Sequence, residues 1–149
     1  MARESLDLLR DIEGAGESGW VLGSIAEIAR QRGQLALARQ YIYQSLHEAS
    51  GPLGMVTIVL GLIIYVNLLL DEGQIVEAAE IGVMLDSLPI CGRSMATQSY
   101  YVTPVVKIME MLPSDAAAQA AARGRARELQ ETAATVMVEL EVGDWVTAD

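Results

Sequence analysis

Residues that interrupt helices recur along this chain at a fixed interval. Gly33, Gly73 and Pro113 lie 40 residues apart, and an alanine follows five positions after each of them. The segments RGQLALARQYIYQSL and EGQIVEAAEIGVMLDSL align without a gap from the glycine onward. A period of this length is typical of helix pairs that stack into an array, because one pair cannot bury its apolar face alone.

Between these breaks the sequence favours helices and contains no sustained strand pattern. Ala, Leu, Glu, Gln and Arg recur, with apolar residues at three- and four-residue spacing. We therefore predict an all-α fold of antiparallel helical hairpins with a C-terminal capping helix, in one domain over residues 1–149. The predicted units are a half-repeat at 2–13, repeat one at 19–50, repeat two at 53–90, repeat three with the cap at 94–140, and a tail at 141–149 that contains Trp145.

The positions of small and apolar residues resemble the tetratricopeptide repeat. Ala38 and Ala78 match the small residue early in the second helix of that repeat, and Leu22, Ile25 and Ala26 match the apolar and small positions of its first helix. The resemblance covers Ala2 to about Leu140. It implies a binding module rather than an enzyme, and we expect no catalytic residues and no cofactor.

Degenerate repeats of this kind occur in large regulators of the LuxR type and in maltose-regulator-like proteins, which carry a nucleotide-binding switch before the repeats. The segment GRARELQETA, residues 124–133, is similar to a pattern that closes such arrays. The resemblance implies protein–protein interaction within a signalling or transcriptional regulator in the cytoplasm. Ala2 stands in the register of Ala38, so we expect a fragment of a longer protein, with a natural single-helix cap as the alternative. The triplet Gly14, Ala15 and Gly16 is predicted to precede repeat one.

An uncharged run of 18 residues extends from Leu53 to Leu70. A membrane span needs about 20 apolar residues, and basic flanks usually mark its cytoplasmic side. This run contains Thr57 and Asn67, has no Lys or Arg nearby, and ends at the turn glycine of repeat two. We therefore predict a buried first helix of repeat two and no membrane span.

The resemblance also implies a concave groove lined by defined positions of each first helix. The groove candidates are Trp20, Glu27 and Arg30 in repeat one, Leu60, Ile63, Asn67 and Leu70 in repeat two, and Tyr100 and Lys107 in repeat three. Two interpretations of the apolar stripe in repeat two remain open. It is a contact site for a protein or, as an alternative, for a small molecule, or it is interior core.

Charge narrows the classes of partner. The net charge of −10 opposes nucleic-acid binding by the whole chain. Arg123, Arg125 and Arg127 form the densest basic cluster, which is either a salt-bridged face, with Arg127 meeting Glu131, or a docking site for an acidic neighbour or phosphate. The expected partner is another protein or a neighbouring domain, with a homodimer or a purely structural oligomerisation module as alternatives.

Isolated residues with reactive side chains do not form a site. His47 is the single histidine and has no companions at metal-ligand spacing, so we expect no metal. Cys91 is the single cysteine, which fits a cytosolic setting, and we expect an inert thiol unless Arg93 activates it. At Pro104 the sequence predicts a kinked helix from about Ser94, with a helix start at Thr103 as the alternative.

Overall fold

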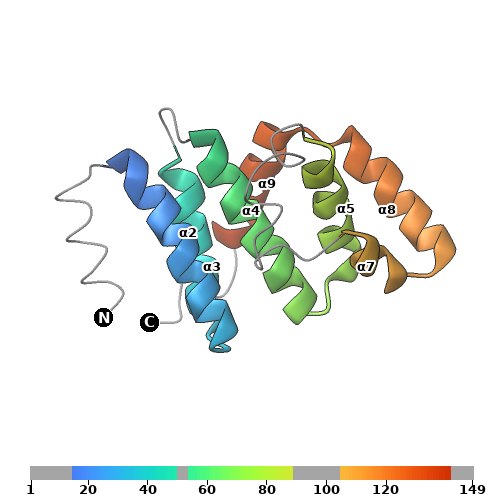
Figure 1. Ribbon diagram of the computed structural model, residues 1–149, viewed down its shortest axis with the longest axis horizontal. Helices are drawn as coiled ribbons and strands as arrows, with labels where there is room; N and C mark the ends of the chain where they lie inside the picture. The colour runs from blue at the N-terminus through green and yellow to red at the C-terminus, as the bar shows by residue number, and fades with distance from the viewer. Residues whose placement is uncertain (1–14, 50–53, 89–104, 142–149) are drawn as a thin grey trace. The chain divides into compact units, whose positions relative to one another are not determined.

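Helices form all the regular structure in the part of the chain that the computed structural model describes, residues 15–49, 54–88 and 105–141. These are α2 (Ala15–Gln31), α3 (Leu35–His47), α4 (Gly54–Asp71), α5 (Ile75–Asp86), α7 (Val105–Glu110), α8 (Ser114–Ala126) and α9 (Leu129–Glu141) (Figure 1). The prediction of an all-helical chain is confirmed for these ranges, which contain no strand.

Contacts divide the chain into two compact units. Unit 1 comprises Met1–Leu62 and Ala133–Asp149, and unit 2 comprises Ile63–Thr132. Helix α4 contributes its residues 54–62 to unit 1 and its residues 63–71 to unit 2. The single domain expected over residues 1–149 stays a prediction.

Two turns of the same construction join α2 to α3 and α4 to α5. Gly33 and Gly73 have φ angles of 77° and 79°, in the left-handed region that favours glycine. In the first turn the N–H of Gln34 donates to the carbonyl of Ala29 at 2.9 Å, and the N–H of Gly33 donates to that of Arg30 at 3.0 Å. This is the Schellman arrangement, which satisfies carbonyls at a helix end. The predicted position of both glycines at a helix C-terminus is confirmed.

The second turn repeats these bonds 40 residues later. Gln74 donates to Leu69 at 2.8 Å and Gly73 donates to Leu70 at 3.2 Å. In each turn the glutamine also accepts the first hydrogen bond of the next helix, from Ala38 or Ala78. Both alanines are fully buried, with 0 % exposure, as expected for the small residue early in the second helix.

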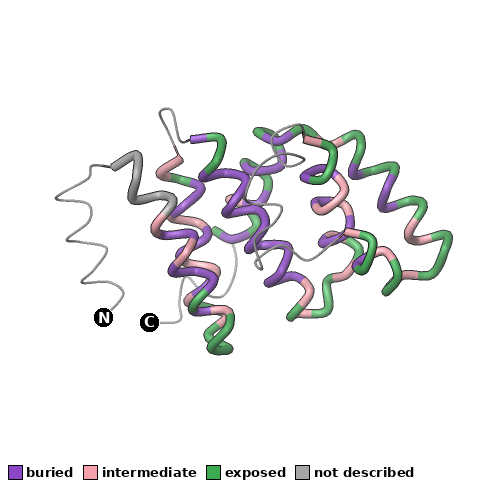
Figure 2. Tube along the Cα trace, in the orientation of Figure 1, coloured by how far each residue is buried: buried purple, intermediate pink, exposed green. Residues whose placement is uncertain are grey.

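Helix α4 is the interior helix that the uncharged run predicts. Its residues from Thr57 to Leu69 are all buried, and most of the α4 trace in Figure 2 is accordingly purple, the colour of buried residues. Within the described ranges α4 is also the one helix long and apolar enough to cross a membrane, and 78 % of it is buried inside the structure. A core helix passes the same test of length and composition, so the absence of a membrane span stays a prediction.

Small residues allow close helix contacts in unit 1. A Cβ atom added at Gly23 of α2 would lie 3.1 Å from the side chain of Leu60 in α4. One added at Gly61 of α4 would lie 3.0 Å from the side chain of Leu46 in α3. Ser45 of α3 lies beside both glycines, so the three helices meet where their side chains are smallest.

The closest approach in unit 2 is between α5 and α8. A Cβ atom added at Gly124 would lie 2.6 Å from the backbone oxygen of Glu80 and 2.7 Å from the Cβ of Val83. Real Cβ atoms do not approach backbone this closely, so only glycine fits here. The buried alanines Ala120 and Ala121 continue this face of α8, which packs on α5.

One expectation about the breaks is wrong. Gly16 does not precede a helix but lies inside α2, which begins at Ala15. A glycine in the first turn costs little, because the N–H groups there have no intrahelical partner in any case. Unlike Ala38 and Ala78, Ala118 is exposed, and α8 begins one residue after Pro113 whereas α3 and α5 begin two residues after their glycines.

The segment 124–133 spans a break rather than one helix, since α8 ends at Ala126 and α9 begins at Leu129. The half-repeat at 2–13, Cys91, Pro104 and Trp145 lie outside the described residues. Helix α7 begins at Val105, directly after that proline.

Replacing Gly33 or Gly73 by Ala is expected to lower the free energy of unfolding by about 1 kcal/mol, because a left-handed backbone is unfavourable for residues with a Cβ. No atom lies within 4 Å of the added Cβ at either site, so the cost is conformational. Urea denaturation followed by circular dichroism measures it. Gly54→Ala is the control, since its Cβ would meet only an ordinary contact at 3.7 Å. Equal stability of Gly33→Ala, Gly73→Ala and the parent would contradict the turn assignment.

Gly124→Ala is expected to cost about 1–3 kcal/mol of stability, because the added methyl must move the backbone of α5 or α8. Gly82→Ala is the matched comparison. Its Cβ would meet the side chain of Val105 at 3.3 Å, and a side chain can shift by a few tenths of an ångström. A thermal melt in which Gly124→Ala is no less stable than Gly82→Ala would contradict the close approach.

Candidate functional site

The groove candidates of repeat one lie on α2. Trp20 belongs to this helix, but its side chain is outside the described part. Glu27 is buried to 1 % exposure, although it carries a carboxylate. Arg30 donates from Nε to Oε1 of Glu27 at 2.8 Å and from Nη2 to Oε2 at 2.7 Å, and Gln31 donates to the same Oε2 at 2.9 Å. The charge of Glu27 is thus compensated within its own helix.

The groove candidates of repeat two lie on α4 and are interior. Leu60, Ile63 and Asn67 are 8 %, 5 % and 4 % exposed, while Leu70 is half-buried near the end of the helix. In unit 1, Leu60 is covered by the close contact with Gly23. The apolar stripe therefore packs inside the chain rather than standing open.

Of the candidates in repeat three, Lys107 is exposed on α7, and Tyr100 lies outside the described residues. Lys107 makes no ion pair with another described residue. The structure thus places the seven described candidates in different surroundings: a neutralised pair on α2, four residues of α4 that are buried or half-buried, and one exposed lysine.

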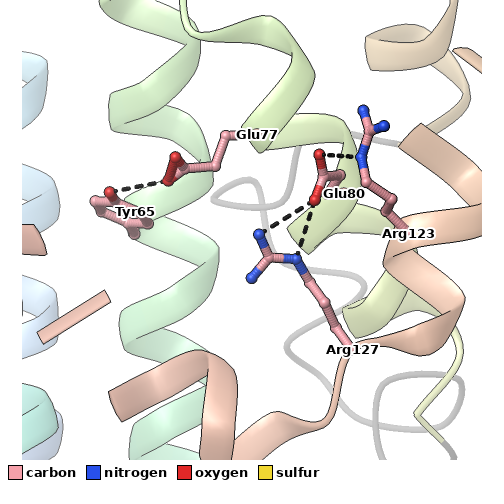
Figure 3. A network of polar contacts seen from close by, with 5 residues as sticks. All are labelled: Tyr65, Glu77, Glu80, Arg123 and Arg127. Carbon is pink, nitrogen blue, oxygen red and sulfur yellow. Dashed lines mark hydrogen bonds and ion pairs between the residues drawn. The ribbon is translucent and has the colours of Figure 1, made fainter. Parts of the chain in front are cut away.

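A cluster of three charged residues joins α5 to the end of α8 in unit 2, and we call it the Glu80 cluster (Figure 3). It consists of Glu80, Arg123 and Arg127. Arg123 donates from Nε to Oε2 of Glu80 at 2.8 Å, and Arg127 donates from Nε and Nη2 to Oε1 at 3.3 and 3.2 Å. Glu80 is 12 % exposed, so its carboxylate is screened from water and held by both arginines.

The predicted basic cluster is therefore divided. Arg123 and Arg127 are brought together by Glu80, whereas Arg125 is exposed and has no ion pair within the described ranges. The expected pairing of Arg127 with Glu131 is wrong. Helix α8 ends at Ala126, and Arg127 has an extended backbone, so the four-residue helical spacing does not apply.

Two neighbouring carboxylates also accept hydrogen bonds. Glu77, one turn before Glu80 on α5, accepts a hydrogen bond from the hydroxyl of Tyr65 at 3.2 Å (Figure 3). Glu128 accepts the N–H groups of Gln130 and Glu131 at 3.1 and 3.2 Å, and so caps the N-terminus of α9.

The sequence did not indicate Glu80 as the partner of the arginines. In the sequence Glu80 is one of several acids in a helical segment, and 43 and 47 residues separate it from Arg123 and Arg127. The small residues opposite each other on α5 and α8 were a usable signal, because they permit the approach that brings these charges into range.

The described residues contain no group of three or more His, Cys, Asp or Glu side chains that could hold a metal ion. The ring of His47 stacks on that of Tyr43, with the ring centroids 6.0 Å apart. The polar chemistry of the site is that of ion pairing.

Thr57 is a different kind of polar residue. It is fully buried at 0 % exposure on α4, and its hydroxyl has no hydrogen-bond partner among the described residues. An unpaired buried hydroxyl costs about 1–3 kcal/mol.

Thr57→Val is therefore expected to raise the free energy of unfolding by about 1 kcal/mol, since it removes the hydroxyl and keeps the shape. Thr135→Val, at an exposed position of α9, is the control and should change stability by less than about 0.5 kcal/mol. Guanidinium denaturation of the three proteins gives both values. A clear loss of stability in Thr57→Val would mean that the hydroxyl has a partner.

Comparisons with known proteins add no further constraint. No family model, no curated protein and no solved structure matches the chain. What the molecule can do is therefore inferred from its own geometry, namely from its repeated turns, its interior helix and its ion-pair clusters.

Proposed function

We propose that this chain is a non-catalytic binding module. In this proposal, antiparallel helical hairpins that resemble tetratricopeptide repeats form an array with a C-terminal capping helix. The module mediates protein–protein interaction within a multidomain signalling or transcriptional regulator in the cytoplasm. It needs no cofactor and no metal, and it contacts neither nucleic acid nor membrane.

The observation that carries the proposal is a burial pattern with the same 40-residue register as the turns. Between repeats one and two, six pairs of apolar residues are buried in both members: Leu22 and Leu62, Ile25 and Tyr65, Ala26 and Val66, Ala29 and Leu69, Ala38 and Ala78, and Tyr41 and Ile81. A shared turn and a shared set of buried positions are what a repeated helix pair requires. This supports the repeat interpretation more strongly than the sequence alignment alone.

Exposed apolar side chains support a binding role. The large ones are Ile28, Met55, Val56, Val76, Val106, Met111 and Val138. Of these, Val106 and Met111 lie at and just after the short helix α7 and are 62 % and 57 % exposed. Single exposed apolar residues are ordinary, but neighbouring ones are typical of contact surfaces.

A small-molecule sensor is the second candidate, and Thr57 favours it. Its buried hydroxyl lacks a partner within the described residues, in an otherwise apolar helix. A ligand with one polar atom and an apolar body would satisfy that hydroxyl. In that case Thr57→Val would abolish the rise in melting temperature that such a ligand causes.

Photo-crosslinking from α7 tests the binding role. A benzophenone amino acid at Val106 is expected to capture another polypeptide in the cells that make the protein, because this side chain is exposed. The same group at Ala118, exposed on α8, is the control. Adducts of twice the chain mass would indicate a homodimer. Failure to capture any polypeptide above the control, from Val106 and from Met111, would contradict the proposal.

A further inference from the structure

We propose that the outer end of the Arg123 guanidinium is a docking point for an acidic side chain of a protein partner, and that Glu80 and Arg127 hold it in position. The inference rests on the proposed binding function and names the chemistry of one contact. It follows from the use of donors in the Glu80 cluster, from the rigidity of that cluster and from its charge.

The terminal nitrogens of Arg123 take no part in its bond to Glu80. A guanidinium carries five N–H groups, one on Nε and four on the two terminal nitrogens. Arg123 reaches Glu80 through Nε alone, and its side chain is 50 % exposed. Figure 3 shows the terminal nitrogens on the side away from Glu80, and no other described residue accepts from them. Arg127, by contrast, uses Nε and Nη2 and is 24 % exposed.

The cluster fixes this free end before any partner arrives. One oxygen of Glu80 receives Arg123 while the other receives Arg127, so the carboxylate cannot rotate away without breaking both ion pairs. The backbone of Glu80 is itself pinned by Gly124, whose added Cβ would lie 2.6 Å from its oxygen. A group already held in its bound geometry loses little conformational entropy on binding.

Charge matching favours a carboxylate as the occupant. Two arginines and one glutamate leave a formal charge of +1 on the cluster, which one carboxylate neutralises. The planar end of a guanidinium receives the two oxygens of a carboxylate in parallel. The nearby acids of the same chain are occupied, since Glu77 accepts from Tyr65 and Glu128 caps α9.

A polyanion fits this surface less well. Nucleic-acid binding gains affinity from many neutralised phosphates, whereas this site offers one free guanidinium end in a chain of net charge −10. An acidic peptide segment needs only a local contact of this kind, supported by other contacts around it.

Titration with an acetylated, amidated hexaglutamate peptide tests the site in the full chain at low salt. The readout is the 15N–1H resonance of Arg127 Nε, which donates to the same carboxylate and is kept in every variant. Saturable shifts are expected at millimolar peptide. Arg123→Gln should raise the Kd about fivefold, as expected for loss of one exposed bidentate pair. Arg125→Gln is the matched control, two residues away and unpaired in the described ranges, and should change the Kd less than about twofold.

Arg123→Lys keeps the charge but removes the planar fork, so it should weaken binding nearly as much as Arg123→Gln if the geometry matters. Circular dichroism shows whether each variant is folded. If Arg123→Gln does not fold, Arg123→Lys still tests the site. If Arg125→Gln and Arg123→Gln raise the Kd of the peptide equally, the peptide is held by general charge attraction. If the resonance shows no saturable shift, the peptide has no site. Either result overturns the inference.

Inorganic phosphate at the same ionic strength serves as the competing anion. Displacement of the peptide by phosphate at equal concentration would overturn the assignment to carboxylate, and an inert phosphate would support it. Crosslinking from Val106 does not involve Arg123, so the two proposals can fail separately. Retained crosslinking with a flat peptide titration rejects only the docking point, whereas loss of both rejects the binding function as well.

Discussion

Two glycines with left-handed backbones determine where the chain turns from α2 to α3 and from α4 to α5. At Gly33 and Gly73 the Schellman bonds close the preceding helix and leave a glutamine to start the next one. The second helix then begins two residues after the glycine, which brings Ala38 or Ala78 into the buried position. A residue with a Cβ would oppose this conformation, so the rest of the pair would have to offset the strain.

Steric and electrostatic terms reinforce each other where α8 meets α5. Gly124 permits an approach that no side chain would allow, and that approach brings Arg123 and Arg127 within reach of one carboxylate. An exposed ion pair alone contributes little, about 0–1 kcal/mol. Glu80 is screened from water and paired with two arginines, so its greater contribution is to fix the position of α8 along α5. Apolar contacts between small residues alone specify that position poorly.

Much of the local structure could be predicted from the sequence because it is determined over short distances. The turn glycines, the interior helix after Leu53 and the buried alanines depend on residues within a few turns of each other. Gly16 was assigned wrongly, since its place depends on where the helix starts and not on residue type alone. The Glu80 cluster joins residues more than 40 positions apart, and no local pattern specifies such a pair. The interior position of Leu60 and Ile63 likewise depends on which helices cover α4.

The junction between α8 and α9 consists of two residues of opposite charge that act in opposite directions along the chain. Arg127 binds back to α5, whereas Glu128 binds forward to the first N–H groups of α9. Both residues of the connection are thus held by hydrogen bonds, Arg127 to α5 and Glu128 to α9. Most loops between helices tolerate insertions, because added residues extend into solvent. Here one inserted residue would separate the anchor of α8 from the cap of α9, so this two-residue link is where the length of the chain is most strictly constrained.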